Sequence, residues 1–159
     1  PVRAAGPVRV VPLTSNDTVV VSIELPDAYD TDLRQAIASG LRTTFTYDIE
    51  LRMVVPTWVD RTVATATVST SDQYDNLTRR HSLQRMVDGR VQDSIVTEED
   101  AVARQWLTML SRVPLIDTAR LDPNRDYYVR ISARARPHGG SLIGWANAVV
   151  GQAKFTLIP

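Results

Sequence analysis

The chain has no cysteine among its 159 residues, which excludes disulfide bonds, thiolate metal sites and cysteine nucleophiles and leaves the redox compartment open. It also has no long hydrophobic run. The longest apolar stretch, around Leu142 to Val150, includes Gly144 and Asn147 and falls well short of the roughly 20 residues that a membrane-spanning helix requires. We therefore expect no transmembrane segment.

An excess of charge of either sign is also missing, because 18 basic and 18 acidic residues cancel. This balance removes the general attraction to nucleic acid that a strongly basic chain would have, so proteins or small molecules are the expected partners. With 43% hydrophobic and 23% charged residues the composition is typical of a globular protein. We expect a single domain over residues 1–159, in which residues 1–7 form a flexible N-terminal segment.

Strict alternation of apolar and polar residues is the strongest pattern that is present. From Leu41 to Val55 one parity is apolar except for Thr43, and the other is polar except for Val54. Successive side chains of a strand point to opposite faces, so the pattern predicts a long strand with one buried and one exposed face. Such alternation favours an antiparallel sheet, because parallel sheets are covered on both faces.

Similar alternation and turn-forming residues predict seven further strands. Asp88-Gly89 is the clearest turn, since this dipeptide favours a tight hairpin in which both residues have positive φ. The additional strands are Val8–Leu13, Thr18–Leu25, Val59–Thr70, Leu77–Val87, Arg90–Val96, Tyr127–Arg136 and Gln152–Ile158.

Two helices are predicted between these strands, and a third, short one is predicted over Leu142–Val150. The first begins at an Asp27 or Asp30 cap and ends before Gly40, and the second runs from Thr97 to Val113, before Pro114. The expected fold is α+β: a long, twisted, mostly antiparallel sheet of about eight strands, as a meander, half-barrel or sandwich, with two or three packed helices.

Several segments, in order along the chain, resemble an uncharacterised bacterial family, domain of unknown function 4390. The most specific is Tyr74-Asp75-Asn76-Leu77-Thr78-Arg79-Arg80. His81 follows it, where the family pattern is expected to have tyrosine. The other matching pieces are Ser39-Gly40-Leu41 leading to Phe45 and Ile49-Glu50-Leu51, Trp58 with Asp60, Thr97 to Ala101, Leu121 to Tyr127, and Ala153 to Pro159.

The resemblance implies an exported protein of the bacterial cell envelope, periplasmic or otherwise outside the cytoplasm. The sequence is compatible with this, since it starts at Pro1 and an extended run to Pro7, as expected of a processed N-terminus whose targeting segment has been removed. The resemblance implies no activity, cofactor or catalytic residue.

Two groups of residues form the candidate interaction surface. Tyr74, Asp75, Asn76, Arg79 and Arg80 gather varied polar groups at the start of a predicted strand. The alternative for this block is a turn made by Asp75 or Asn76, with Leu77 in the core and one arginine paired with an acid on a neighbouring strand.

The second group is an arginine column, Arg130, Arg134 and Arg136, which shares one face of a predicted strand. Such a column could hold phosphate or carboxylate groups. The favoured alternative is a solvated sheet face on which these arginines pair with Asp48 and Glu50.

No pattern of residues indicates catalysis, a metal site or a cofactor. His81 and His138 are the only histidines and lack a recognisable ligand spacing, and nothing near Asp72 or Asp75 predicts the burial that an acid–base role requires. We expect a non-catalytic interaction or assembly module with a protein partner. The alternatives are a carrier that holds an apolar ligand such as a lipid between sheet and helices, and a hydrolase using Asp72, Asp75 or His81.

Overall fold

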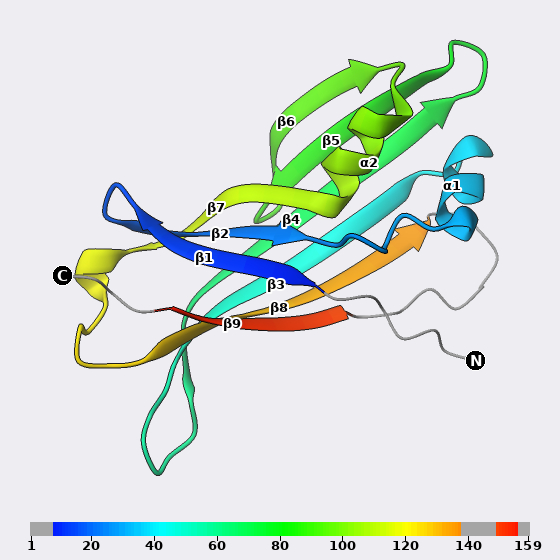
Figure 1. Cartoon of the computed structure of the whole chain (residues 1–159). Coiled ribbons are helices and arrows are strands. Elements are labelled where there is room, and N and C mark those ends of the chain that lie inside the picture. Colours follow the sequence, from blue (N-terminus) through cyan, green and yellow to red (C-terminus); the bar gives the residue numbers. More distant parts are fainter. Residues whose placement is uncertain (1–7, 138–148, 156–159) are drawn as a thin grey trace.

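The computed structural model describes residues 8–137 and 149–155 (Figure 1). Predictions for residues 1–7 and for most of the helix expected over Leu142–Val150 lie outside this part of the chain. In order, the elements are β1 (Arg9–Ser15), β2 (Thr18–Glu24), α1 (Thr31–Ala38), β3 (Thr43–Met53), β4 (Arg61–Asp75), β5 (Arg80–Val87), β6 (Arg90–Thr97), α2 (Asp100–Thr108), β7 (Met109–Asp117), a 3-10 turn (Thr118–Arg120), β8 (Tyr127–Pro137) and β9 (Val149–Phe155).

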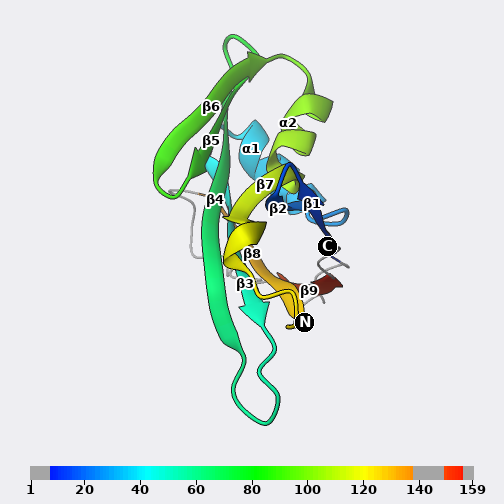
Figure 2. The same cartoon turned by 90° about the vertical axis from the view of Figure 1, so that its left-hand side faces the viewer.

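The nine strands form two antiparallel sheets. The larger has six strands in the order β6-β5-β4-β3-β8-β9, and the smaller has three in the order β1-β2-β7. The small sheet and both helices cover one face of the large sheet, and no described helix or strand covers the opposite face, here called the open face (Figure 2). The predicted α+β class, with a mostly antiparallel sheet and helices packed on it, is confirmed, in the form of two packed sheets.

β3 forms the centre of the large sheet, as its alternation predicts. Buried and half-buried residues alternate along most of the strand, with Thr43, Phe45, Tyr47, Ile49 and Leu51 in the interior. β3 pairs with β4 on one side and with β8 on the other. Its buried side chains form one core with Val19, Val21 and Ile23 of β2 and with Leu107 of α2.

The two sheets also approach each other at one edge, where β9 lies beside β1 (Figure 1). A Cβ atom added to Gly151 of β9 would lie 3.1 Å from the Val8 side chain and 3.2 Å from that of Val10. Glycine therefore permits the close approach, which brings one end of the large sheet against one end of the small sheet.

The helix predicted from Thr97 to Val113 is wrong beyond Thr108, where the chain passes directly into β7. In a longer helix the carbonyls of Leu107 and Thr108 would accept from residues four positions later. Here the Leu107 carbonyl accepts the hydroxyls of Tyr47 and Thr70, and the Thr108 carbonyl accepts the Leu25 N–H at 2.9 Å. Donors from other parts of the chain thus bind the carbonyls at the end of the helix, and residues 109–117 pair with β2.

Other boundaries shift by several residues. β4 extends to Asp75 and β5 begins at Arg80, so residues 76–79 form the turn between them, and Leu77, placed in the core by one interpretation, is 95% exposed. Val149 and Val150 belong to the backbone of β9, which contradicts the end of the predicted third helix. The hairpin at Asp88-Gly89 is confirmed, with φ of 49° and 82°. Within the described residues, neither helix has the length and apolar character to cross a membrane.

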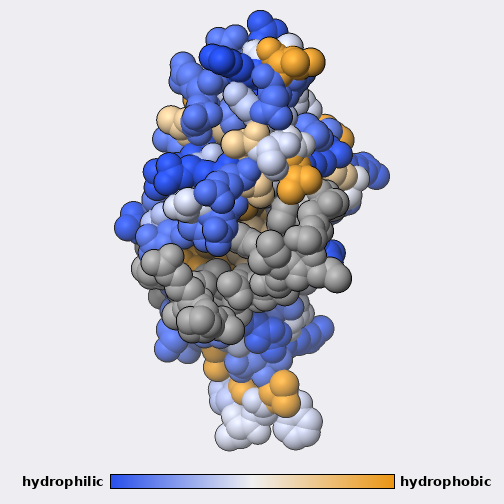
Figure 3. All heavy atoms as spheres, turned by 90° about the vertical axis from the view of Figure 1, so that its right-hand side faces the viewer, coloured by the Kyte–Doolittle hydropathy of each residue, from blue (hydrophilic) through white to orange (hydrophobic). Residues whose placement is uncertain are grey.

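Besides Leu77, and besides Val11 of β1 and Met109 of β7, which are 46% and 42% exposed, two pairs of large apolar side chains are exposed, each pair within one segment of the chain. Trp58 and Val59, in the connection between β3 and β4, are 80% and 72% exposed. Hydrophobic side chains are visible at this lower end of the molecule (Figure 3). Val91 and Val96 of β6 are 56% and 63% exposed.

Candidate functional site

Most of the Tyr74–Arg80 block forms the end of β4 and the following turn, and only Arg80 is at the start of a strand, β5. Asp75 Oδ1 accepts the backbone N–H groups of Leu77 at 2.8 Å and Thr78 at 3.3 Å, and Arg79 has a positive φ of 58°. These hydrogen bonds, first that from Leu77, lower the pKa of the Asp75 carboxyl. Asp75 therefore makes the turn, as the structural alternative for this block predicts.

The other members of the block do not form a common surface. Tyr74 is half-buried and its ring lies 4.7 Å from that of His81. Arg80 forms an exposed ion pair with Glu98, with 3.5 Å between Nε and Oε1. Asn76 and Arg79 are exposed in the turn. The block is thus divided between the protein interior and solvent.

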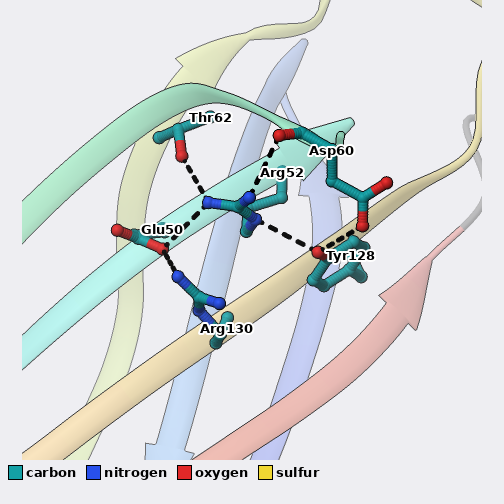
Figure 4. Close-up of polar contacts among 6 residues, drawn as sticks. All are labelled: Glu50, Arg52, Asp60, Thr62, Tyr128 and Arg130. Carbon is teal, nitrogen blue, oxygen red and sulfur yellow. Dashed lines mark hydrogen bonds and ion pairs between the residues drawn. The ribbon is translucent and has the colours of Figure 1, made fainter. Parts of the chain in front are cut away.

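The arginine column lies on the open face of β8 and is largely paired. Arg130 contacts Glu50 at 2.7 Å (Figure 4). Arg134 contacts Asp48 at 2.8 Å, so the favoured interpretation is confirmed for these two arginines. Arg136 is exposed and stands opposite Thr44 of β3. β3 and β4 separate this column from β5, so it does not join the Tyr74–Arg80 block in one basic patch.

A polar network continues from Glu50 to the end of the β3–β4 hairpin (Figure 4). Arg52 donates to the Tyr128 hydroxyl at 3.1 Å, to Thr62 Oγ1 at 2.7 Å and to the Asp60 carbonyl at 3.1 Å. The Tyr128 hydroxyl donates to Asp60 Oδ2 at 2.7 Å. These contacts from three strands and a loop fix the base of the β3–β4 connection.

A chain of ionisable groups on the inner face of β4 and β5 joins Asp72, His81 and Asp100. His81 Nδ1 lies 2.8 Å from Asp72 Oδ2, and Nε2 lies 2.7 Å from Asp100 Oδ1. Each ring nitrogen therefore lies within hydrogen-bond distance of a carboxylate oxygen. This arrangement connects β4, β5 and the first turn of α2.

The two carboxylates that contact His81 differ in burial. Asp72 is fully buried and Asp100 has a side chain that is 84% exposed. Burial raises the pKa of Asp72, and the charge and hydrogen bond of His81 oppose that shift. Tyr29 lies near both acids, and its pKa is raised, first by burial and then by Asp72 and Asp100.

The geometry of the Asp72–His81–Asp100 group limits its access to a substrate. The His81 side chain is 3% exposed and both nitrogens already face carboxylates, so a substrate would have to displace Asp100 to reach the imidazole. Within residues 8–137 and 149–155, no group of three or more histidine, aspartate or glutamate side chains is arranged to hold a metal ion. The arrangement fits a clamp between elements better than an acid–base site.

The open face of the large sheet carries shallow cavities beside β6, lined by polar and apolar side chains. One, of about 410 Å³, is lined by residues of three strands and by Arg42; its β6 members are Ser94, Ile95 and Val96. A second, of about 460 Å³, shares Arg42 and Gln84 with it and extends over Thr44, Ser69 and Ser71. The two cavities therefore form one depression that reaches β6, the outermost strand.

The fold and this surface define a class of protein, an α+β module of two packed antiparallel sheets with one polar face open. A family model matches residues 8–138 of the chain, and its description is Domain of unknown function (DUF4390). Because the match covers most of the sequence, the chain belongs to this family, which confirms the resemblance found in its motifs. No curated protein and no solved structure matches the chain.

Proposed function

We propose that this protein is a non-catalytic interaction module that binds an extended segment of a partner protein along the outer edge of β6. The main support for this proposal is the position of β6 at the edge of the six-stranded sheet, where only β5 pairs with it among the described strands. The other backbone edge of β6 is available to a further strand. Proteins add such strands to recognise extended peptides.

The second half of β6 lacks the features that normally prevent edge pairing. Ser94-Ile95-Val96-Thr97 contains no charge and no proline, and two of its residues are β-branched and apolar. Native edges are usually protected by charged side chains, proline or bulges. The first half of β6 has such protection, with Arg90, Asp93 and a register shift opposite Arg85 and Met86.

Other sheet edges in the described chain differ from this segment. β1 contains Pro12 and lies beside β9, and β7 contains Pro114 and a positive φ of 52° at Arg112. The depression next to Ser94–Thr97 adds apolar contact from Leu83 and one cation, Arg42. The proposed partner segment is therefore extended and largely uncharged, with alternate side chains directed into that depression.

The test uses a photo-reactive amino acid at Ser94 in cells that produce the protein. We expect a covalent protein adduct, and we expect Val96→Lys to reduce it about tenfold or more, because a lysine on the edge opposes strand addition. Val91→Lys is the matched control, since Val91 is also exposed on β6 but lies in the protected half. The proposal fails if no adduct forms, or if both substitutions reduce the adduct equally.

Location in the bacterial cell envelope is a second part of the proposal, and the family resemblance supports it. Fractionation of a native host should place the protein outside the cytoplasm; recovery in the cytoplasmic fraction alone would contradict this part.

Transport of an apolar ligand stays an alternative prediction. The cavities described above open on the outer face of the large sheet and not between sheet and helices, so they do not favour it.

A further inference from the structure

The connection between β3 and β4 ends in an uncharged segment, residues 54–59, which we call the apolar tip. Its sequence is Val54-Val55-Pro56-Thr57-Trp58-Val59, and Trp58 and Val59 are its most exposed large side chains. The tip is the lower extremity of the molecule, away from the small sheet and both helices (Figures 1 and 2). It is thus a convex apolar projection and not part of the core.

The conformation of the tip is fixed by its own backbone. Trp58 N–H donates to the Val55 carbonyl at 3.1 Å, with Pro56 and Thr57 between them, and Thr57 has a positive φ of 61°. Proline followed by a residue of positive φ is the pattern of a type II turn, which normally places glycine or asparagine where threonine stands here. A β-branched residue is strained in this region, so the turn is maintained against a local conformational cost.

The base of the tip is also fixed. Asp60 Oδ1 accepts the Val55 N–H at 3.4 Å, and the Val54 N–H donates to the Asp126 carbonyl at 2.8 Å. On the side of the sheet, Arg52 and Tyr128 bind Asp60 in the network described above (Figure 4). The tip is therefore presented on a rigid support, and binding through it requires little ordering of the chain.

We propose that the apolar tip inserts into the interfacial region of a lipid bilayer. A stable protein interface uses about 20–30 residues on each side, whereas the tip has six residues. A bilayer needs no complementary pocket, and tryptophan is enriched at the membrane–water interface because its ring is apolar and its N–H polar. Asp60 and the exposed Arg61 follow the tip directly, at the level where lipid headgroups would lie.

Vesicle sedimentation tests this proposal with the full chain. Vesicles of phosphatidylcholine, alone or mixed with phosphatidylglycerol, serve as probes, and the mixture shows whether Arg61 adds attraction to anionic lipid. We expect the wild type to sediment with vesicles and the double variant Trp58→Ser, Val59→Ser to lose roughly tenfold or more in partition coefficient, because two apolar side chains no longer leave water. Leu77→Ser is the matched control, since Leu77 is exposed in a turn of the same protein.

Phospholipids with brominated acyl chains provide a second measurement. They should quench part of the tryptophan fluorescence of the wild type, and the double variant should lose that quenching. The variant should melt at the wild-type temperature, because both side chains are largely exposed. Val96→Lys should bind vesicles as the wild type does, so that failure of the edge-binding proposal and failure of this one are distinguishable.

Three outcomes would overturn the proposal. The first is that the wild type sediments with neither vesicle, and the second is that wild type and double variant sediment equally. The third is that the wild type self-associates in solution and the double variant does not. The last result would assign the tip to a contact between copies of the chain.

Discussion

At the scale of single residues, the least expected finding is the polar chain from Asp72 to Asp100. Burial of Asp72 was not predicted, although Asp72 continues the parity of Ala66, Val68 and Thr70 on β4, which the structure shows to be the buried parity. The side chains that contact Asp72 could not have been predicted. His81 lies opposite Tyr74 in the strand register, and Asp100 comes from the following helix, so only the folded arrangement brings the three side chains together.

Removal of the imidazole should destabilise the protein much more than removal of the outer carboxylate. We expect His81→Ala to lower the free energy of unfolding by about 3–5 kcal/mol at neutral pH, because it leaves the Asp72 charge buried without a partner. Asp100→Ala should lower it by less than about 1 kcal/mol, since Asp100 is mostly exposed. Urea unfolding of both variants checks this, and losses of equal size would contradict the clamp.

The arginine column shows how much residue patterns alone can establish. The sequence places Arg130 and Arg134 on the same sheet face as Glu50 and Asp48, and the structure pairs them. The interior cation Arg85 was not predicted. It lies 4.3 Å from the Trp106 ring centroid, its Nε has no hydrogen-bond partner within the described structure, and burial lowers its pKa.

At the scale of elements, predictions held where the local signal and the tertiary contacts agree. α1 begins after Asp30, whose side chain accepts the Leu33 N–H at 2.9 Å, as expected of an N-cap. α2 is different, because the apolar spacing of Met109, Leu110 and Val113 suits a helix as well as a strand. Pairing with β2 decides in favour of the strand, and a single sequence does not contain that information.

The turn between β4 and β5 gives a prediction of pH dependence. The folded-state pKa of Asp75 is lowered, so its stabilising contribution is present above the unfolded-state pKa and is lost as pH falls through the folded-state value. Asp75→Asn keeps an acceptor oxygen but cannot titrate. Chemical denaturation at several acidic pH values should show that the wild type loses stability relative to Asp75→Asn as pH decreases. A constant difference between the two proteins would refute the turn assignment.

At the scale of the whole molecule, the large sheet is joined to α2 by two hydroxyls on one carbonyl. Tyr47 of β3 and Thr70 of β4 both donate to the Leu107 carbonyl in the buried interface. Either donor can satisfy this carbonyl, because an oxygen has two lone pairs. Removal of both leaves a buried acceptor without these partners, which is costly.

The effects of Tyr47→Phe and Thr70→Val on stability should therefore not be additive. Each single variant should lower the free energy of unfolding by about 0.5–1.5 kcal/mol, and the double variant should lose about 1 kcal/mol more than their sum. A double-mutant cycle measured by thermal or urea unfolding gives the coupling energy. Additive losses would mean that the carbonyl finds another donor once both hydroxyls are gone.

The length of β4 has a consequence for the two proposed binding surfaces. This strand has 15 residues, begins just after the apolar tip and ends in the part of the sheet that contains β6 (Figure 1). At about 3.3 Å per residue it spans up to about 50 Å. A molecule held at a bilayer by the tip would therefore present the β6 edge several nanometres above the lipid headgroups, and β4 would act as the spacer that sets the height at which a partner is met.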